Sequence, residues 1–293
     1  MTSPTVWELL ERQLQEPALL EWAPSDPVVL AIASEKGGVG KSGLAGGLAA
    51  VMVAASHRVL AIDLDPRATL TEELGAEASE YGVNDLLYVP PGADPDELPE
   101  LPGLASQALQ PAGAAWGDGV QVLAAERALA HREMDTATGG LEHRLRVSLE
   151  GVAEKFDLVV IDLPPRAGGK LVGAGLLAAT HVVFPGTLDA DGLIGIRDAQ
   201  RTYRFMTQTN PRPLREVGVL RNIVAPRTKL AAHYDAQFTE AFGARLLNVA
   251  VPKRVIRQEA RGACVPITAA DDKPDAKDLI KSYTQVLNAV GRT

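Results

Sequence analysis

The sequence has a single cysteine, Cys264, in 293 residues, and only 4% of its residues are aromatic. One cysteine cannot form a disulfide framework, and neither it nor the five scattered histidines have the spacing of a metal cluster. A lone cysteine also fits a reducing cytosol. The few aromatic residues form no row beside the basic residues of the C-terminal part, so we expect no stacking on single-stranded bases.

No segment has the features of a membrane-inserting element. The first residues lack the basic-then-apolar layout of a secretory signal. The longest apolar run, residues 43–56, is too short and too rich in Gly and Ala to span a bilayer. The C-terminal segment lacks the lysine-rich, bulky apolar pattern of an amphipathic membrane anchor. We therefore expect a cytoplasmic protein with no membrane partner.

Acidic residues exceed basic ones, but the excess is uneven. The chain has 37 acidic and 29 basic side chains, a net charge of −8. Residues 1–190 have a net charge of −15, and residues 191–293 have a net charge of +7. Such asymmetry indicates a basic surface in the C-terminal part. The net acidity therefore does not exclude a nucleic-acid partner.

Apolar runs alternate with helical patterns from residue 28 onward. Residues 28–34 are an apolar run without alternation, which is typical of a strand buried on both faces. Further strand candidates are at residues 58–63, 119–125, 156–162, 181–186, 216–224 and 246–252. Helical patterns separate most of them, at residues 42–55, 141–155, 170–180, 191–208, 230–243 and 274–290. This alternation predicts an α/β fold, a single doubly wound and mostly parallel sheet flanked by helices, over residues 28–293.

Two segments depart from this alternation. Residues 1–27 are predicted to be a short N-terminal helical extension, because Trp7, Leu10 and Leu14 recur at helical spacing before three prolines. Residues 90–119 are rich in Pro, Gly and Ala and are predicted to be a surface excursion with one short helix.

A glycine-rich loop follows the first predicted strand and has the features of a phosphate-binding loop. It reads Lys36-Gly37-Gly38-Val39-Gly40-Lys41-Ser42 and leads into a predicted helix. Consecutive glycines let backbone N–H groups point at phosphate oxygens, and the helix N-terminus adds its dipole. Lys41 would reach the β- and γ-phosphates, and the Ser42 hydroxyl can ligate Mg²⁺. The general pattern has glycine at the position of Glu35, so this is a variant with an extra lysine, Lys36.

Three carboxylates follow predicted strands. Asp63 and Asp65 end the strand at 58–63, and Asp162 ends the strand at 156–162. Ligands bind beyond the carboxyl ends of the strands of an open parallel sheet, so all three are expected beside the glycine-rich loop. Mg²⁺ takes one or two carboxylates together with phosphate oxygens and water. Hydrolysis of a nucleotide also needs a group that orients the attacking water.

The loop motif KGGVGKS resembles the deviant Walker A motif of the ParA/MinD group of P-loop ATPases, and plasmid-type ParA proteins are most similar. DLDPRATLT is similar to the first switch segment of that family, and VVIDLPP to its Walker B and second switch segment. The similarity continues through WGDGVQVLAAERALAHRE, FPGTLDADGLIGI, GVLRNIVAPRTKL and NVAVPKRVIRQEARGACVPI, and so covers most of residues 28–290.

The resemblance implies ATP and Mg²⁺ as cofactors and a role for each matching residue. Lys36 would reach the phosphates of the partner in a nucleotide-sandwich dimer, and Lys41 and Asp65 would act in hydrolysis, Asp65 by positioning water. Asp63 would lie near Mg²⁺, and Asp162 would hold it through water.

The resemblance also concerns the residues that contact the nucleotide. Gly43 stands where relatives carry a hydroxyl residue that contacts the α-phosphate, and Arg67 stands where they usually have Gln. Pro252 and, more weakly, Asn222 are the candidates for contacts to adenine.

Basic residues cluster after the last predicted strands. Phosphate backbones are bound by clustered Lys and Arg without reading of bases. In ParA proteins this region binds DNA nonspecifically when ATP is bound. The residues predicted to do so are Arg227, Lys229, Lys253, Arg254, Arg257 and Arg261. The alternative is a solvated basic helix that pairs with neighbouring acidic residues.

The resemblance thus predicts an ATP-dependent DNA-partitioning ATPase with a slow intrinsic rate. It would dimerise with ATP, bind double-stranded DNA nonspecifically, and hydrolyse ATP when a ParB-like partner stimulates it, so as to segregate a plasmid or chromosome. Its location would be cytoplasmic and nucleoid-associated. Two alternatives remain open: a ParA-like positioner of a protein cargo, and a nucleotide-switched DNA-binding regulator.

Overall fold

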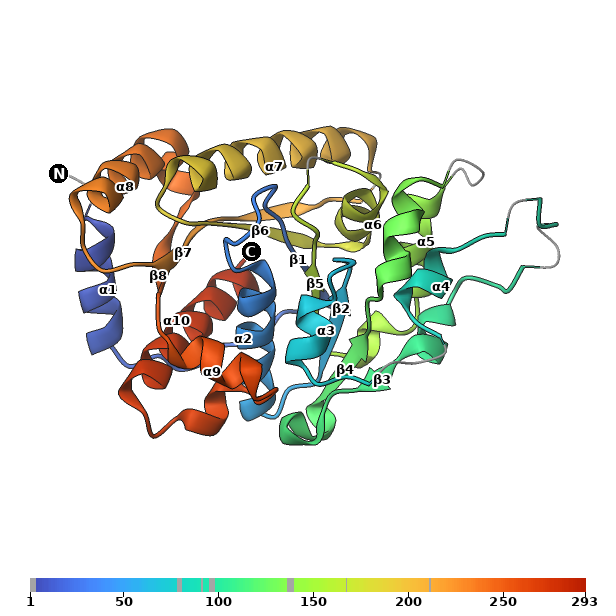
Figure 1. Ribbon diagram of the computed structural model, residues 1–293, viewed down its shortest axis with the longest axis horizontal. Helices are drawn as coiled ribbons and strands as arrows, with labels where there is room; N and C mark the ends of the chain where they lie inside the picture. Colours follow the sequence, from blue (N-terminus) through green and yellow to red (C-terminus); the bar gives the residue numbers. More distant parts are fainter. Residues whose placement is uncertain are drawn as a thin grey trace.

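The computed structural model describes residues 4–77, 81–90, 92–94, 98–135, 140–166, 168–210 and 212–293. One sheet runs through the molecule in the strand order β3-β4-β2-β5-β1-β6-β7-β8 (Figure 1). Neighbouring strands are parallel except β3 and β4. The predicted doubly wound, mostly parallel sheet is therefore confirmed. The strands are β1 Val28–Ile32, β2 Val59–Asp63, β3 Gln110–Pro111, β4 Val120–Leu123, β5 Leu158–Asp162, β6 His181–Gly186, β7 Arg215–Val224 and β8 Leu246–Pro252.

The central strands are buried on both faces, which explains their uninterrupted apolar sequences. Successive side chains of a strand point to opposite faces. In β1, Val29 and Ala31 pack in one core with α4, α5, α6, α7 and α8, while Leu30 and Ile32 pack in a second core with α2, α3, α9 and α10. The helices are α1 Val6–Gln15, α2 Lys41–Ala54, α3 Thr69–Glu73, α4 Val83–Leu87, α5 Leu141–Ser148, α6 Lys170–Ala178, α7 Ala190–Thr209, α8 Lys229–Phe242, α9 Ile256–Gly262 and α10 Pro274–Gly291.

Helix α1 covers the edge of the sheet at β8 (Figure 1). Edge strands carry unpaired backbone groups that need partners. The side-chain amide of Gln13 supplies them: its Nε2 donates to the carbonyl oxygen of Ala250 at 3.0 Å, and the N–H of Ala250 donates to its Oε1 at 3.0 Å. Nε2 also donates to the Ser282 hydroxyl of α10 at 2.8 Å. The buried side chain of Gln13 thus makes the two backbone hydrogen bonds at Ala250 that a neighbouring strand would otherwise make.

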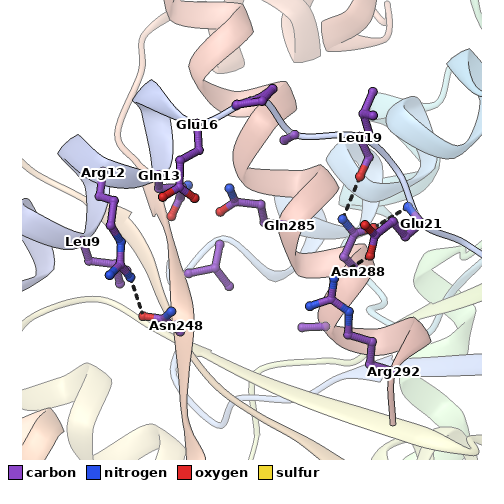
Figure 2. A pocket seen from close by; sticks show the side chains of 14 residues that line it. Leu9, Arg12, Gln13, Glu16, Leu19, Glu21, Asn248, Gln285, Asn288 and Arg292 are labelled. Carbon is purple, nitrogen blue, oxygen red and sulfur yellow. Dashed lines mark hydrogen bonds and ion pairs between the residues drawn. The ribbon is translucent and has the colours of Figure 1, made fainter.

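The segment after α1 is fastened to α10 (Figure 2). Asn288 donates from Nδ2 to the carbonyl oxygen of Leu19 at 2.8 Å, and its Oδ1 accepts from the N–H of Glu21 at 2.8 Å. Arg292 adds an ion pair with Glu21 at 2.5 Å. Between α1, this segment, β8 and α10 lies a cavity of about 370 Å³. The extension is therefore part of the packed structure.

Two regions differ from the sequence-based expectation. The helix expected over 141–155 ends at Ser148, and a 3₁₀ turn, η5 Ala153–Lys155, follows Gly151, whose φ is 76°. In the excursion at 90–119, two 3₁₀ helices, η2 Leu104–Ala108 and η3 Ala114–Gly119, flank the short antiparallel β3. Among the described residues, no helix is both long and apolar enough to cross a bilayer.

Candidate nucleotide-binding site

Three neighbouring strands end side by side at one edge of the sheet. The register pairs Ile32 of β1 with Asp162 of β5, and Asp63 of β2 with the same Asp162. The backbone itself therefore places the two carboxylates next to each other and next to the start of the loop that follows β1. This is the edge at which open parallel sheets bind ligands.

The loop after β1 leads directly into α2 and needs glycine at two positions. Gly38 has a φ of 82°, and Gly40, immediately before α2, has a φ of 80°. Both lie in the left-handed region, which side chains disfavour. A Cβ on Gly40 would also lie 2.7 Å from Cδ1 of Ile223. The first N–H groups of a helix have no acceptor within the helix, so this tightly held turn can offer them to phosphate oxygens.

Asn222 of β7 supports the loop from behind. Its Nδ2 donates to the carbonyl oxygen of Val39 at 2.7 Å and to that of Gly40 at 3.4 Å. Asn222 thus contacts the loop backbone, whereas the sequence predicted a contact with adenine. Pro252, the other predicted adenine contact, is buried at the end of β8 opposite Val224. The sequence did not indicate the supporting role of Asn222.

Lys41 is the first residue of α2 and is only 6% exposed. Its Nζ donates to the carbonyl oxygen of Lys36 at 3.3 Å, so the ammonium folds back over the loop. Burial lowers the pKa of Lys41, and the nearby carboxylates of Asp162 and Asp65 oppose that shift. A cation enclosed in this way is suited to the β- and γ-phosphates of a nucleotide.

The carboxylate of Asp63 organises the turn after β2. It accepts from the N–H of Asp65 at 3.0 Å, and from the N–H and hydroxyl of Thr71 at 2.9 and 3.0 Å. Burial raises the pKa of Asp63 to about 6, although these hydrogen bonds oppose the shift. Because its oxygens already accept three hydrogen bonds, Asp63 positions Asp65 and α3. This differs from the metal-binding role that the sequence predicted for it.

Asp65 is buried and held by Arg67. The guanidinium lies against the carboxylate, with Nη2 at 2.8 Å from Oδ2 and Nε at 3.3 and 3.2 Å from the two oxygens. The N–H of Arg67 also donates to Oδ1 at 3.0 Å. The Arg67 side chain is 63% exposed. Asp65 is therefore oriented but engaged, and it can act on a water only after this exposed arginine moves away.

Asp162 is the carboxylate with free oxygens. It is fully buried, and neither oxygen has a hydrogen-bond partner in the described part of the chain. Burial and the charge of Asp63 raise the pKa of Asp162 well above its ordinary value. The Ser42 hydroxyl and Lys41 lie close enough to oppose this shift, although neither makes a hydrogen bond of good geometry.

Ser42 and Asp162 fit a Mg²⁺ ion that is bound together with a nucleotide. A divalent cation would give the Asp162 oxygens the partners that the protein does not provide. Mg²⁺ commonly uses one or two protein oxygens and completes its shell with phosphate oxygens and water. The described residues contain no group of three or more His, Cys, Asp or Glu suited to a metal on its own. The donor set is therefore one that needs the phosphates.

Lys36 extends from the loop towards α7. Its Nζ forms an ion pair with Oδ2 of Asp191 at 2.6 Å, and both side chains are exposed. The hydrogen bond and charge of Asp191 raise the pKa of Lys36. Helix α7 can approach the loop because residue 195 is glycine: a Cβ there would lie 2.7 Å from Cβ of Lys36. Exposed ion pairs contribute little stability, so Lys36 can exchange Asp191 for another anion.

Four of the six basic residues predicted to contact DNA are exposed. They follow β7 and β8, and so lie at the same edge of the sheet as the glycine-rich loop. We call them the basic edge, which consists of Arg227, Lys229, Lys253 and Arg261. Arg227 lies over the ring of Trp7 in α1, at 5.6 Å from the ring centre.

The other two, Arg254 and Arg257, have partners within the chain. Arg254 pairs with Asp275 and Asp278 of the α10 region at 3.1 and 2.6 Å. Arg257 turns inward, donates to the carbonyl oxygen of Gly43 from Nη2 at 2.7 Å and from Nε at 3.2 Å, and pairs with Glu73.

The placement of Arg257 corrects its assignment to the DNA surface. Its side chain is only 15% exposed. The four-residue spacing from Arg261 predicted a shared outer face, but α9 spans only seven residues, and the carboxylate of Glu73, buried nearby, draws Arg257 inward.

The comparisons with known proteins agree with this geometry. A family model described as an AAA domain matches residues 28–214. The chain is 34% identical to the chromosome-partitioning ATPase Soj of Thermus thermophilus over 232 residues, which is 79% of this chain and 83% of that protein. It is 30% identical to the chromosome partitioning protein ParA of Caulobacter vibrioides over 254 residues, 84% of this chain and 88% of that protein.

A solved structure gives a similar result. The cobyrinic acid a,c-diamide synthase of Mycobacterium smegmatis, solved with an ATP analogue and magnesium, has a TM-score of 0.66 and 28% sequence identity to this chain. The similarity covers 82% of this chain and 93% of that one.

Replacing Asp162 with Asn should stabilise the protein when it is free of nucleotide and magnesium. The change replaces a buried carboxyl group whose ionisation costs stability, because it lies beside Asp63 and its oxygens have no hydrogen-bond partner among the described residues. The expected gain is about 1–3 kcal/mol at pH 7.5. The folded-state pKa is raised, so the native protein holds a proton that the unfolded chain releases, and the charge costs stability as the pH rises. Urea unfolding should therefore show a smaller gain at pH 5 than at pH 7.5.

The exposed Asp118→Asn is the matched control and should change the free energy of unfolding little at either pH. A lower stability of Asp162→Asn at both pH values, or a gain independent of pH, would contradict the interpretation of Asp162 as an unsatisfied buried carboxylate.

Proposed function

Since this chain belongs to the ParA/Soj family of chromosome-partitioning ATPases, we propose that it is an ATP-dependent DNA-partitioning ATPase. In this proposal ATP promotes a nucleotide-sandwich dimer that binds DNA without sequence preference. A ParB-like partner then stimulates hydrolysis, which releases the DNA. The observation that carries the proposal is the buried carboxylate of Asp162, which has no hydrogen-bond partner among the described residues and lies beside Ser42 and Lys41.

The glycine-rich loop binds the phosphates of ATP. The N–H groups from Gly38 to Ser42 donate to phosphate oxygens, and the enclosed ammonium of Lys41 balances their charge. Ser42 and Asp162 would hold Mg²⁺. A bound Mg²⁺ supplies charge neutralisation at the phosphate group that is transferred to water. The pKa shift of Asp162 fits a carboxylate that ionises fully only when the cation is present.

Asp65 orients the water that attacks the γ-phosphate. Its position after β2 is fixed by the hydrogen bond from its N–H to Asp63. The ion pair with Arg67 supports a slow intrinsic rate, because Asp65 must be released before it can accept a hydrogen bond from water. In this proposal the ParB-like partner accelerates the reaction by favouring the released state.

Lys36 acts across the dimer. It is exposed, it extends from the phosphate loop, and its partner Asp191 is also exposed. On dimerisation it exchanges this carboxylate for the phosphates bound by the partner protomer. A lysine that points away from its own loop is suited to this contact, whereas the enclosed Lys41 is suited to the phosphates of its own protomer.

The basic edge binds the DNA backbone. Its four exposed cations belong to the part of the chain with a net charge of +7, and backbone binding needs clustered cations but no base contacts. The proposed cargo is a plasmid or a chromosome, and the proposed location is the nucleoid in the cytoplasm. Arg254, which is paired with aspartates, would contribute less.

Substitutions of the two lysines of the loop should have different effects on ATP binding and on dimerisation. Lys41→Ala should weaken ATP binding about 10–100-fold, because it removes the enclosed charge at the phosphates. Lys36→Ala should change ATP affinity little but abolish the ATP-dependent shift in sedimentation velocity, with Lys155→Ala as the control. Unchanged ATP affinity of Lys41→Ala would refute the phosphate-loop assignment, and dimerisation of Lys36→Ala would refute the role across the dimer.

Charge reversal at the basic edge should remove DNA binding. The double variant Arg227→Glu/Lys253→Glu, measured by fluorescence anisotropy with a DNA duplex and a non-hydrolysable ATP analogue, should bind at least about tenfold more weakly. The slope of log affinity against log salt should fall by about 2.

The matched control for that variant is Lys155→Glu/Arg245→Glu. It also reverses one exposed lysine and one exposed arginine, but these precede β5 and β8 and so lie at the opposite edge of the sheet. Equal loss of DNA affinity in both double variants would show that net charge, and not the basic edge, determines binding.

A further inference from the structure

We propose that Arg257 is a positioning residue that couples the nucleotide site to the DNA-binding surface. This inference rests on the proposed function. Arg257 lies on α9 between Lys253 and Arg261 of the basic edge, yet its guanidinium turns away from that surface. It lines a cavity of about 330 Å³ together with Lys41, Asp65 and Arg261, so one residue of the basic edge borders the same cavity.

The first contact of Arg257 is with the helix that follows the phosphate loop. Its Nη2 and Nε both donate to the carbonyl oxygen of Gly43, at 2.7 and 3.2 Å. Gly43 is in the first turn of α2, directly after Ser42. A bound phosphate would lie against the N–H groups of this turn. Any displacement of the turn on phosphate binding therefore changes the two hydrogen bonds of Arg257.

The second contact is with the segment that carries Asp65. Arg257 pairs with Glu73, which is 1% exposed and ends α3. Helix α3 is tied to the turn after β2, because the N–H and hydroxyl of Thr71 donate to the carboxylate of Asp63. The second oxygen of Glu73, Oε2, has no hydrogen-bond partner in the part of the chain that the structure describes. Arg257 is thus the cation that makes this buried carboxylate tolerable.

The sequence of α2 is adapted to this pair. A Cβ on Gly46 would overlap Oε1 of Glu73, and a Cβ on Gly43 would lie 3.4 Å from Nη2 of Arg257. The two glycines are three residues apart and so share one face of α2. They form the groove in which the pair lies. The glycine at position 43 thus has a structural reason in this chain.

The ion pair of Arg257 and Glu73 therefore joins three elements: α2, which follows the glycine-rich loop, the segment that follows Asp65, and α9, which carries Arg261 of the basic edge. Buried ion pairs tolerate little loosening, because an unpaired charge in the interior is costly. ATP binding that sets α2 and α3 in place also sets α9 in place. By linkage, ATP should raise DNA affinity, and DNA should raise ATP affinity by the same factor.

The test compares two variants. Arg257→Met removes the ion pair and leaves Glu73 unpaired, whereas Glu73→Leu/Arg257→Met replaces the pair with apolar side chains of similar size. Such replacements commonly preserve folding stability. For each protein, the affinity for a fluorescent, non-hydrolysable ATP analogue with Mg²⁺ is measured with and without a DNA duplex, and urea unfolding is measured in parallel.

The coupling factor is the ratio of the two affinities. It should be about 5–150-fold in the wild type, the usual range for such coupling, and should fall to less than twofold in both variants. The double variant should regain the urea midpoint of the wild type without regaining the factor. If the double variant regains both the urea midpoint and the coupling factor of the wild type, the ion pair is only structural and the inference is overturned. A wild-type factor near one would contradict the proposed function as well.

Two further outcomes complete the test. Glu73→Gln should lower the coupling factor. Asp235→Asn weakens another buried ion pair, in which Oδ1 of Asp235 lies 2.7 Å from Nε of Arg221, and it should leave the coupling factor unchanged. An equal effect of both would attribute the coupling to general loosening and overturn the inference. The inference would also be overturned if Arg257→Met lost more than tenfold in ATP affinity but kept the coupling factor of the wild type, because Arg257 would then only bind the nucleotide.

Discussion

The structure depends on the burial of like charges at one edge of its sheet. The parallel register pairs Asp63 with Asp162 directly, and both are fully buried. Unpaired buried carboxylates are costly. Asp63 accepts hydrogen bonds, whereas no described residue donates one to either oxygen of Asp162, which lies close to the enclosed ammonium of Lys41. A cation and a phosphate group bound at this site would therefore stabilise it. Stability is exchanged for the ability to bind a nucleotide.

Much of the fold could be predicted because a buried parallel sheet leaves a simple pattern in the sequence. The strands at 181–186 and 246–252 were predicted with the bounds that the structure has. The phosphate loop and the carboxylates could also be placed, because each directly follows such a run and the ends of parallel strands share one edge. Local sequence is sufficient for features of this kind.

The features that could not be predicted arise from contacts between distant segments. Helical spacing selected Trp7, Leu10 and Leu14 in α1, but only Leu10 of these is buried. The buried face includes Gln13, because the edge strand β8 needs a hydrogen-bond partner. Arg257 looked like a surface cation, because nothing near it in the sequence reveals that Glu73 is buried beside it. Partner choice between buried polar groups depends on tertiary contacts, and periodicity does not contain them.

In the proposed site, Asp162 and Ser42 form half of a magnesium site that a nucleotide completes. The decisive measurement is isothermal titration calorimetry of a non-hydrolysable ATP analogue, with Mg²⁺ and with EDTA in its place. Mg²⁺ should strengthen binding at least about tenfold, which corresponds to about 1.4 kcal/mol, and Asp162→Asn should remove this gain. Equal affinity in Mg²⁺ and in EDTA, or a full gain in Asp162→Asn, would contradict the proposed magnesium site.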